Sequence, residues 1–133
     1  MSEDLIFTPE NILGAEGLLA RRMKGYEPRP QQIVMANDIL DSFLGKDHLV
    51  VEAGTGVGKS FGYLVPAILA TTQEYLFEGE KQRPYRRVVI STQTISLQEQ
   101  LIRKDLPFLN SLLPLEFSFV LVKDVRITFV FAA

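Results

Sequence analysis

Apolar and polar residues follow one another in blocks along the chain, and the spacing within each block predicts a type of element. Thr8 before Pro9 is a helix-start signal, so a first short helix is expected from there to about Met23. From Gln31 onward, apolar residues recur at helical spacing up to a stop at Gly45. These residues are Met35, Ala36, Ile39, Leu40, Phe43 and Leu44. The second pattern predicts an amphipathic helix that packs on a core.

Short apolar runs alternate with helical patterns in the rest of the chain. A short buried strand is expected at 48–52, and further strands are expected at 88–91 and 117–122. Further helices are expected from about Lys59 to about Leu76 and from about Ile95 to about Asp105. Strands that alternate with helices are typical of an α/β fold in which helices flank a parallel sheet. The sequence therefore predicts that fold class.

Composition narrows the class of protein. The chain has 133 residues, of which 47% are hydrophobic and 23% charged, as in an ordinary globular domain. The absence of cysteine excludes disulfides and thiolate metal sites within these residues, and one histidine, His48, is too few for a multi-histidine metal centre. The net charge of −2 does not mark a nucleic-acid binder, so any such binding must come from local geometry.

The N-terminal residues are acidic where a secretory signal would be basic, and no apolar stretch reaches membrane-spanning length. We therefore expect a soluble cytoplasmic protein with no membrane partner. The oligomeric state is left open.

A glycine-rich loop falls between the strand expected at 48–52 and the next helix. It matches the phosphate-binding loop, or Walker A motif, with alanine at the usual first glycine. Its residues are Ala53, Gly54, Thr55, Gly56, Val57, Gly58, Lys59 and Ser60. Glycine backbones can turn N–H groups inward, and the helix start adds its positive dipole end. We expect a nucleoside triphosphate here, with Lys59 between the β- and γ-phosphates and Ser60 on Mg²⁺. The alternative is a glycine turn that merely joins strand to helix.

Gln32 bears on which base is bound. It lies on the apolar stripe of its helix, so it should face the domain and need polar partners. Its carboxamide could accept from the exocyclic amine of adenine and donate to the adjacent ring nitrogen. A helix-capping or interdomain hydrogen bond would explain the glutamine equally well.

A second candidate site follows the strand expected at 88–91. Thr92 and Thr94 stand just before a helix start, where hydroxyls and N–H groups can bind a nucleic-acid phosphate. The alternative is structural, because Ser96 with Glu99 fits a capping box.

Three segments, in this order, resemble the DinG/XPD-type superfamily-2 DNA helicases: YEPRPQQIVM at 26–35, EAGTGVGKS at 52–60 and VISTQTISLQEQL at 89–101. The resemblance implies a RecA-like P-loop NTPase domain that couples ATP hydrolysis to 5′-to-3′ movement on DNA, in DNA repair. It assigns Arg29 and Gln32 to adenine, Lys59 and Ser60 to the triphosphate and Mg²⁺, and Thr92 and Thr94 to single-stranded DNA. An alanine-first phosphate loop is normal for this group.

The resemblance also divides the chain. We expect a helical lead-in at 1–25, the N-terminal part of the first RecA-like domain at 26–122, and a tail unlike the family at 123–133. Family members continue with Lys-Gly-Arg-x-Asn-Tyr-Leu-Cys, whose cysteine is the first iron–sulfur ligand, and Val130 takes that place here. The iron–sulfur cluster is therefore not expected in this chain. One G inserted after the Lys123 codon would let the shifted triplets spell the family sequence, so we hypothesise a one-base deletion, testable by sequencing the gene.

No Asp-Glu pair occurs in the chain, so the family's Asp-Glu-x-His segment, which would complete the magnesium site, is missing. We expect an ATP-binding helicase fragment with weak binding at most and no unwinding. One alternative is a small self-contained P-loop kinase or NTPase that uses Asp124 for magnesium. Another is a non-enzymatic remnant that adheres to a partner or aggregates.

Overall fold

The structure is a computed structural model, and it describes residues 7–54, 56, 58–73, 87–122 and the backbone of 127–132. Thr55 and Val57 of the phosphate loop lie outside the described residues, as do Asp124 and the end of the helix expected to reach about Leu76. The described part mixes helices and strands, as the sequence predicted.

Two short helices replace the single helix expected from Thr8 to Met23. They are α1 (Pro9–Leu13) and α2 (Leu18–Arg22). Thr8 caps α1 as expected, because its Oγ1 accepts a hydrogen bond from the Asn11 N–H at 3.2 Å. The chain then turns back so closely that a Cβ on Gly17 would lie 2.8 Å from the Asn11 carbonyl oxygen. A continuous helix is therefore wrong here, because the glycines allow a turn between two helices.

The amphipathic helix is confirmed as α3 (Pro30–Gly45), with Ala36 and Leu40 buried. The left-handed residue at its end is Lys46, not a glycine. The helix α4 (Lys59–Thr72) begins where predicted and ends sooner. A Cβ on Gly62 would lie 3.1 Å from the Met35 sulfur, so this glycine lets α3 and α4 approach closely.

The second half of the chain contains the strands. They are β1 (Arg87–Ser91), β2 (Phe117–Val122) and β3 (Ile127–Ala132). Between β1 and β2 a continuous helical segment consists of α5 (Ile95–Gln100), the π-helical turn η2 (Leu101–Asp105) and α6 (Leu106–Leu112). Pro107 lacks an N–H and its ring crowds the carbonyl four residues earlier, which a wider turn at this point relieves.

The sheet is antiparallel, so the expected parallel sheet is wrong for the pairs that the structure describes. Its order is β1-β3-β2, and β3 runs antiparallel to both neighbours. Phe129 lies opposite Val89 on one side and Val120 on the other. β1 and β2 therefore share one direction, and the strand between them, from the tail expected to be unlike the family, reverses it.

The buried strand expected at 48–52 is also wrong. These residues belong to none of the described strands, and the side chain of Val50 is 96% exposed. Leu49 and Val51 are exposed as well. An apolar run becomes a buried strand only where a neighbouring strand pairs with it, and here β3 takes the inner position of the sheet.

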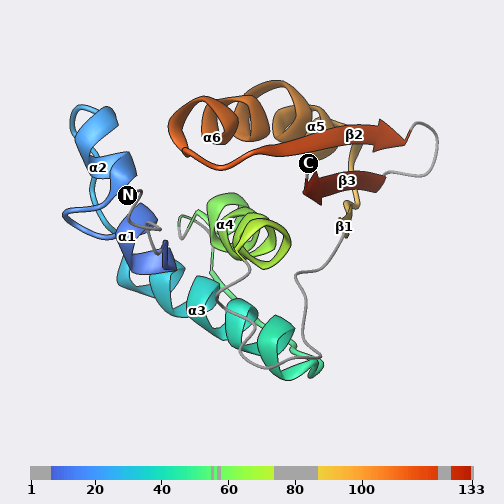
Figure 1. Cartoon of the computed structure of the whole chain (residues 1–133), viewed down its shortest axis with the longest axis horizontal. Helices are drawn as coiled ribbons and strands as arrows, with labels where there is room; N and C mark the ends of the chain where they lie inside the picture. The colour runs from blue at the N-terminus through green and yellow to red at the C-terminus, as the bar shows by residue number, and fades with distance from the viewer. Residues whose placement is uncertain (1–6, 55, 57, 74–86, 123–126, 133) are drawn as a thin grey trace, which may run out of the picture.

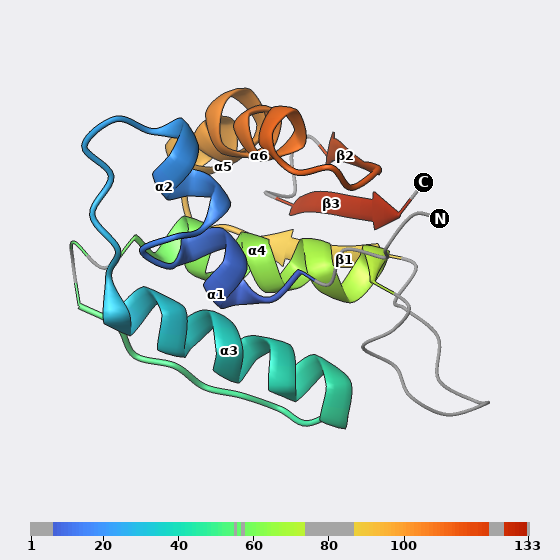
Figure 2. The ribbon, with the colours of Figure 1, turned by 60° about the vertical axis from the view of Figure 1, so that its left-hand side comes forward.

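Helix α4 lies at the centre of the molecule (Figure 1) and contacts α3 and all three strands. Figure 2 shows α3 on one side of α4, with the sheet and the α5 to α6 segment on the other. The core packs α4 against α1, α2, the helical segment from η2 to α6, and β2. Its buried residues include Ile12, Leu13, Leu19, Leu64, Ile68, Leu69, Leu101, Leu106, Leu109 and Phe117. In the part of the chain that the structure describes, no helix is long and apolar enough to cross a membrane.

Candidate nucleotide-binding site

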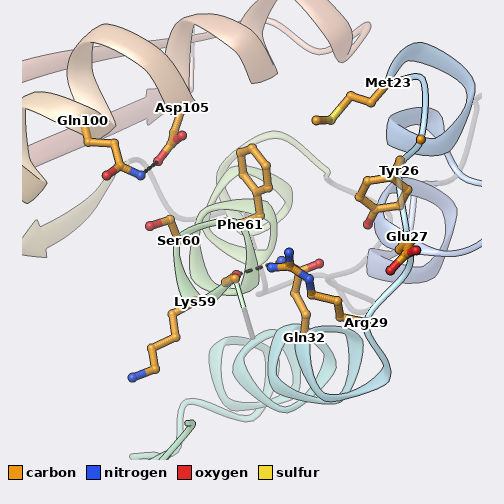
Figure 3. A pocket seen from close by; sticks show the side chains of 12 residues that line it. Met23, Tyr26, Glu27, Arg29, Gln32, Lys59, Ser60, Phe61, Gln100 and Asp105 are labelled. Atoms are coloured by element: carbon orange, nitrogen blue, oxygen red, sulfur yellow. Dashed lines mark hydrogen bonds between the residues drawn. The ribbon is translucent and has the colours of Figure 1, made fainter. Parts of the chain in front are cut away.

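A cavity of about 400 Å³ opens at the N-terminal end of α4, where the sequence placed the phosphate loop. Its walls come from three parts of the chain, shown in Figure 3: the segment before α3, the first turn of α4, and the α5–η2 junction. The lining residues include Met23, Tyr26, Glu27, Arg29, Gln32, Gly58, Lys59, Ser60, Phe61, Gln100 and Asp105. The fold thus brings Arg29 and Gln32 together with Lys59 and Ser60.

The described glycines of the loop have the backbone expected of a phosphate cradle in part. Gly56 has φ 83° and Gly58 has φ 79°, both in the left-handed region that favours glycine. Gly54 does not have a positive φ. Gly58 immediately precedes α4, so the loop ends at the positive end of a helix of 14 residues.

Gln32 is buried, with 3% of its surface exposed, as its place on the helix stripe predicted. Its Nε2 donates a hydrogen bond to the Gly58 carbonyl oxygen at 2.7 Å. Its Oε1 is buried and has no hydrogen-bond partner. The amide nitrogen therefore binds the loop through a hydrogen bond that is neither of the helix-capping nor of the interdomain kind. The amide oxygen is an unsatisfied acceptor beside the cavity, which a ligand donor could use.

The segment before α3 is fixed from behind. The Tyr26 hydroxyl donates to the Leu13 carbonyl oxygen at 2.7 Å, which ties this wall to α1. Burial raises the pKa of the Tyr26 phenol, and the nearby Arg29 guanidinium acts in the opposite direction. Arg29 also approaches the loop, since a Cβ on Gly58 would lie 2.9 Å from its Nη1.

Lys59 and Ser60 form the first turn of α4. The Lys59 side chain is exposed and extends away from Tyr26 and Glu27 (Figure 3). Ser60 is half-buried and shares a side-chain hydrogen bond with Tyr63, one turn later. Burial raises the pKa of Tyr63; the bond to Ser60 opposes that shift and the Asp105 carboxylate adds to it.

Asp105 and Gln100 line the cavity but were not singled out from the sequence. Gln100 Nε2 donates to Asp105 Oδ2 at 3.3 Å, across five residues. Positions five apart do not share a face of an α-helix, but the π-turn η2 brings them together. No sequence signal marks a π-turn strongly enough to have revealed this pair.

The two threonines proposed for DNA make local hydrogen bonds. Thr94 caps α5, since its Oγ1 accepts from the Leu97 N–H at 3.2 Å, so the capping residue is Thr94 and not Ser96. Thr92 is 7% exposed and its hydroxyl donates to the Thr94 carbonyl oxygen at 3.3 Å. Thr94 is the exposed member of the pair.

The chain is similar to curated bacterial proteins over most of its length. It is 36% identical over 110 residues to the 3′-5′ exonuclease DinG of Bacillus subtilis, covering 83% of this chain and 11% of that protein. It is 41% identical over 110 residues to the ATP-dependent DNA helicase DinG of Photobacterium profundum, covering 79% and 14%. It is 38% identical over 103 residues to the ATP-dependent DNA helicase YoaA of Haemophilus influenzae, covering 77% and 14%.

These matches show which family the chain belongs to. The matched residues form a helicase region, and within that class the region is of the DinG type, which confirms the resemblance. The chain spans only about a tenth to a seventh of the length of these relatives. No protein-family model matches the sequence. No solved structure matches it either.

Proposed function

We propose that this chain provides the ATP-binding region of an ATP-dependent DNA helicase of the DinG type, with a RecA-like P-loop arrangement. The buried Gln32 carries this proposal. Its amide nitrogen binds the loop that leads to Lys59 and Ser60, and its unpartnered oxygen lies where a base amine could donate. Sequence similarity to helicases described as ATP-dependent supports ATP as the nucleotide.

Each residue has a role in this proposal. Gln32 and Arg29 hold the adenine end, and Lys59 meets the β- and γ-phosphates. The glycine loop of residues 53–58 offers its backbone N–H groups, and Ser60 is the protein ligand of Mg²⁺. Magnesium, when bound, offsets the negative charge of the phosphates. The described residues contain no cluster of three or more acidic, cysteine or histidine side chains that could hold a metal ion.

The chain boundaries carry over into the proposal. Residues 26–122 are assigned to the helicase region, 1–25 to a helical lead-in and 123–133 to a tail outside the family pattern. DNA contact is assigned to the Thr92 to Thr94 turn, chiefly through the exposed Thr94. Movement along DNA in the 5′-to-3′ direction belongs to a complete helicase, and this chain alone binds ATP without unwinding.

Nucleotide affinity tests the proposal. The 133-residue chain should bind a fluorescent ATP analogue in the presence of Mg²⁺, and Lys59→Ala should weaken binding by at least tenfold, about 1.4 kcal/mol. Lys24→Ala is the matched control, because Lys24 is exposed between two lining residues but is not itself one. Equal binding by both variants, or robust Lys59-dependent and DNA-stimulated ATP turnover by this chain, would contradict the proposal as stated.

A further inference from the structure

The cavity holds two carboxylates on opposite walls, and they differ in their surroundings. Glu27 is exposed and stands on the same wall as Arg29. Asp105 is half-buried and lies on the same side as Ser60 (Figure 3). A carboxylate near the start of α4 is unexpected, because that end of the cavity is otherwise suited to anions.

One hydrogen bond holds Asp105 in this position, and its charge acts on a residue of α4. Gln100 Nε2 donates to its Oδ2 at 3.3 Å, which holds the carboxyl group across the π-turn. The Asp105 charge acts on Tyr63, whose side chain is hydrogen-bonded to Ser60. The carboxylate therefore lies in the electrostatic range of the first turn of α4, where the proposed function puts the phosphates and the metal.

We propose that the Asp105 carboxylate makes triphosphate binding in this cavity depend on a divalent cation. This inference rests on the proposed function. Without the cation, Asp105 repels the negatively charged phosphates. With a divalent cation bound to the triphosphate, the Asp105 carboxylate would face a positive charge that offsets the phosphates, so its repulsion of the nucleotide would be reduced or reversed. Asp105 is thus a residue of the cavity that selects the metal complex of the nucleotide over the free nucleotide.

The π-turn is the element that makes this possible. In a regular α-helix, Gln100 and Asp105 would point to different faces. The wider turn directs both toward the cavity, and π-turns in helices occur frequently at functional sites. A purely structural role for the pair, closing the turn before Pro107, predicts no effect of the Asp105 charge on nucleotide binding.

The experiment compares the dissociation constant of a fluorescent ATP analogue with saturating Mg²⁺ and with EDTA, at constant ionic strength. The dissociation constant in EDTA divided by the dissociation constant in Mg²⁺ measures the metal dependence of binding. This ratio is determined for the 133-residue chain, for Asp105→Asn and for Glu27→Gln. Asp105→Asn should lower this ratio by about tenfold, mainly by tightening binding in EDTA. Glu27→Gln removes the same charge from the opposite wall and should leave the ratio within about twofold of the unmodified chain.

The outcomes separate this inference from the proposed function. Nucleotide binding with an unchanged ratio in Asp105→Asn overturns the inference and leaves the proposed function intact. An equal fall in both variants overturns it too, because general pocket charge would then explain the effect. If the unmodified chain binds no nucleotide with or without Mg²⁺, both fail. Should Asp105→Asn lose its cooperative melting transition, Asp105→Ser makes the same charge change with a smaller side chain and is judged by the same ratio.

Discussion

Gly58 combines two demands that only glycine meets. Its φ of 79° is unfavourable for a side chain, and a Cβ there would collide with the Gln32 amide nitrogen and lie 2.9 Å from Arg29 Nη1. Gly56 shares the positive φ without any atom within 4 Å, and Gly54 has neither constraint. Substitutions at the three positions therefore distinguish the cost of backbone strain from the cost of a steric collision.

Alanine at each position should give a graded loss of stability. Gly56→Ala should lower the free energy of unfolding by about 1–2 kcal/mol, the usual cost of a left-handed residue. Gly58→Ala should cost more, because the Gln32 bond to the loop is lost as well. Gly54→Ala should be nearly neutral. Urea denaturation of the three variants measures the order, and an equal loss at 54 and 58 would contradict this account of the loop.

Asp105 should make stability depend on pH. Burial raises its pKa from 3.8, with the Gln100 bond and Lys104 opposing, so the folded chain keeps the proton longer than the unfolded chain. The free energy of unfolding should therefore fall as pH rises from near 3.8 through the raised pKa, and then level off. Asp105→Asn should remove this fall. The difference between the urea midpoints of the two proteins, followed from about pH 4 to pH 7, tests it, and a difference that does not change with pH would contradict it.

Single residues were predictable from sequence where the reason for them was local. The burial of Gln32 followed from its place on a helix stripe, and the loop followed from its spacing. The hydrogen bond between Gln32 and Gly58 was not predictable, since it joins positions 26 residues apart. Asp105 was missed because its place in the cavity depends on an irregular turn.

At the scale of elements, the start of α5 differs from the Ser96–Glu99 capping box that the sequence offered. Thr94 caps the helix, whereas Ser96 is exposed inside it. Thr94→Ala should lower the free energy of unfolding by about 1 kcal/mol, because the Leu97 N–H loses its acceptor. Ser96→Ala should change it by much less. Thermal or urea unfolding of both variants measures these two losses. A larger loss for Ser96→Ala would contradict the Thr94 cap and support the Ser96–Glu99 capping box.

The bounds of helices and strands were predicted better than the pairing of the strands. The bounds of α3, β1 and β2 agree with the apolar patterns closely, because those patterns reflect local backbone preference and one buried face. Strand direction and the fate of residues 48–52 depend on which strands meet in space. The tail forms β3, which lies between β1 and β2, and no local sequence pattern predicts that pairing.

The whole molecule depends on β3 more than its position near the end of the chain suggests. It is the only described strand paired on both edges, and α4 contacts it. Phe129→Pro removes a backbone donor from this central strand and should unfold the sheet, exposing the amides of β1 and β2 to hydrogen exchange.

Glu116→Pro is the control for that variant, because Glu116 is exposed and lies just before β2, outside the ladder. Its amide exchange in β1 should match that of the unmodified chain. Retained protection of β1 in Phe129→Pro would show that the helices, and not β3, hold the strand in place.

The hydrogen bond from Gln32 to Gly58 couples the end of the cavity near Arg29 to the loop that leads to Lys59. On its N-terminal side the loop follows an exposed segment that belongs to none of the described strands, so the Gln32 bond and the start of α4 help to fix where Gly58 lies. In the proposed nucleotide site, a ligand that draws the Gln32 amide toward a base would also alter the loop to which we assign the phosphates. Thermodynamic linkage makes the effect reciprocal: the factor by which bound phosphate changes the affinity for the base equals the factor by which the bound base changes the affinity for phosphate.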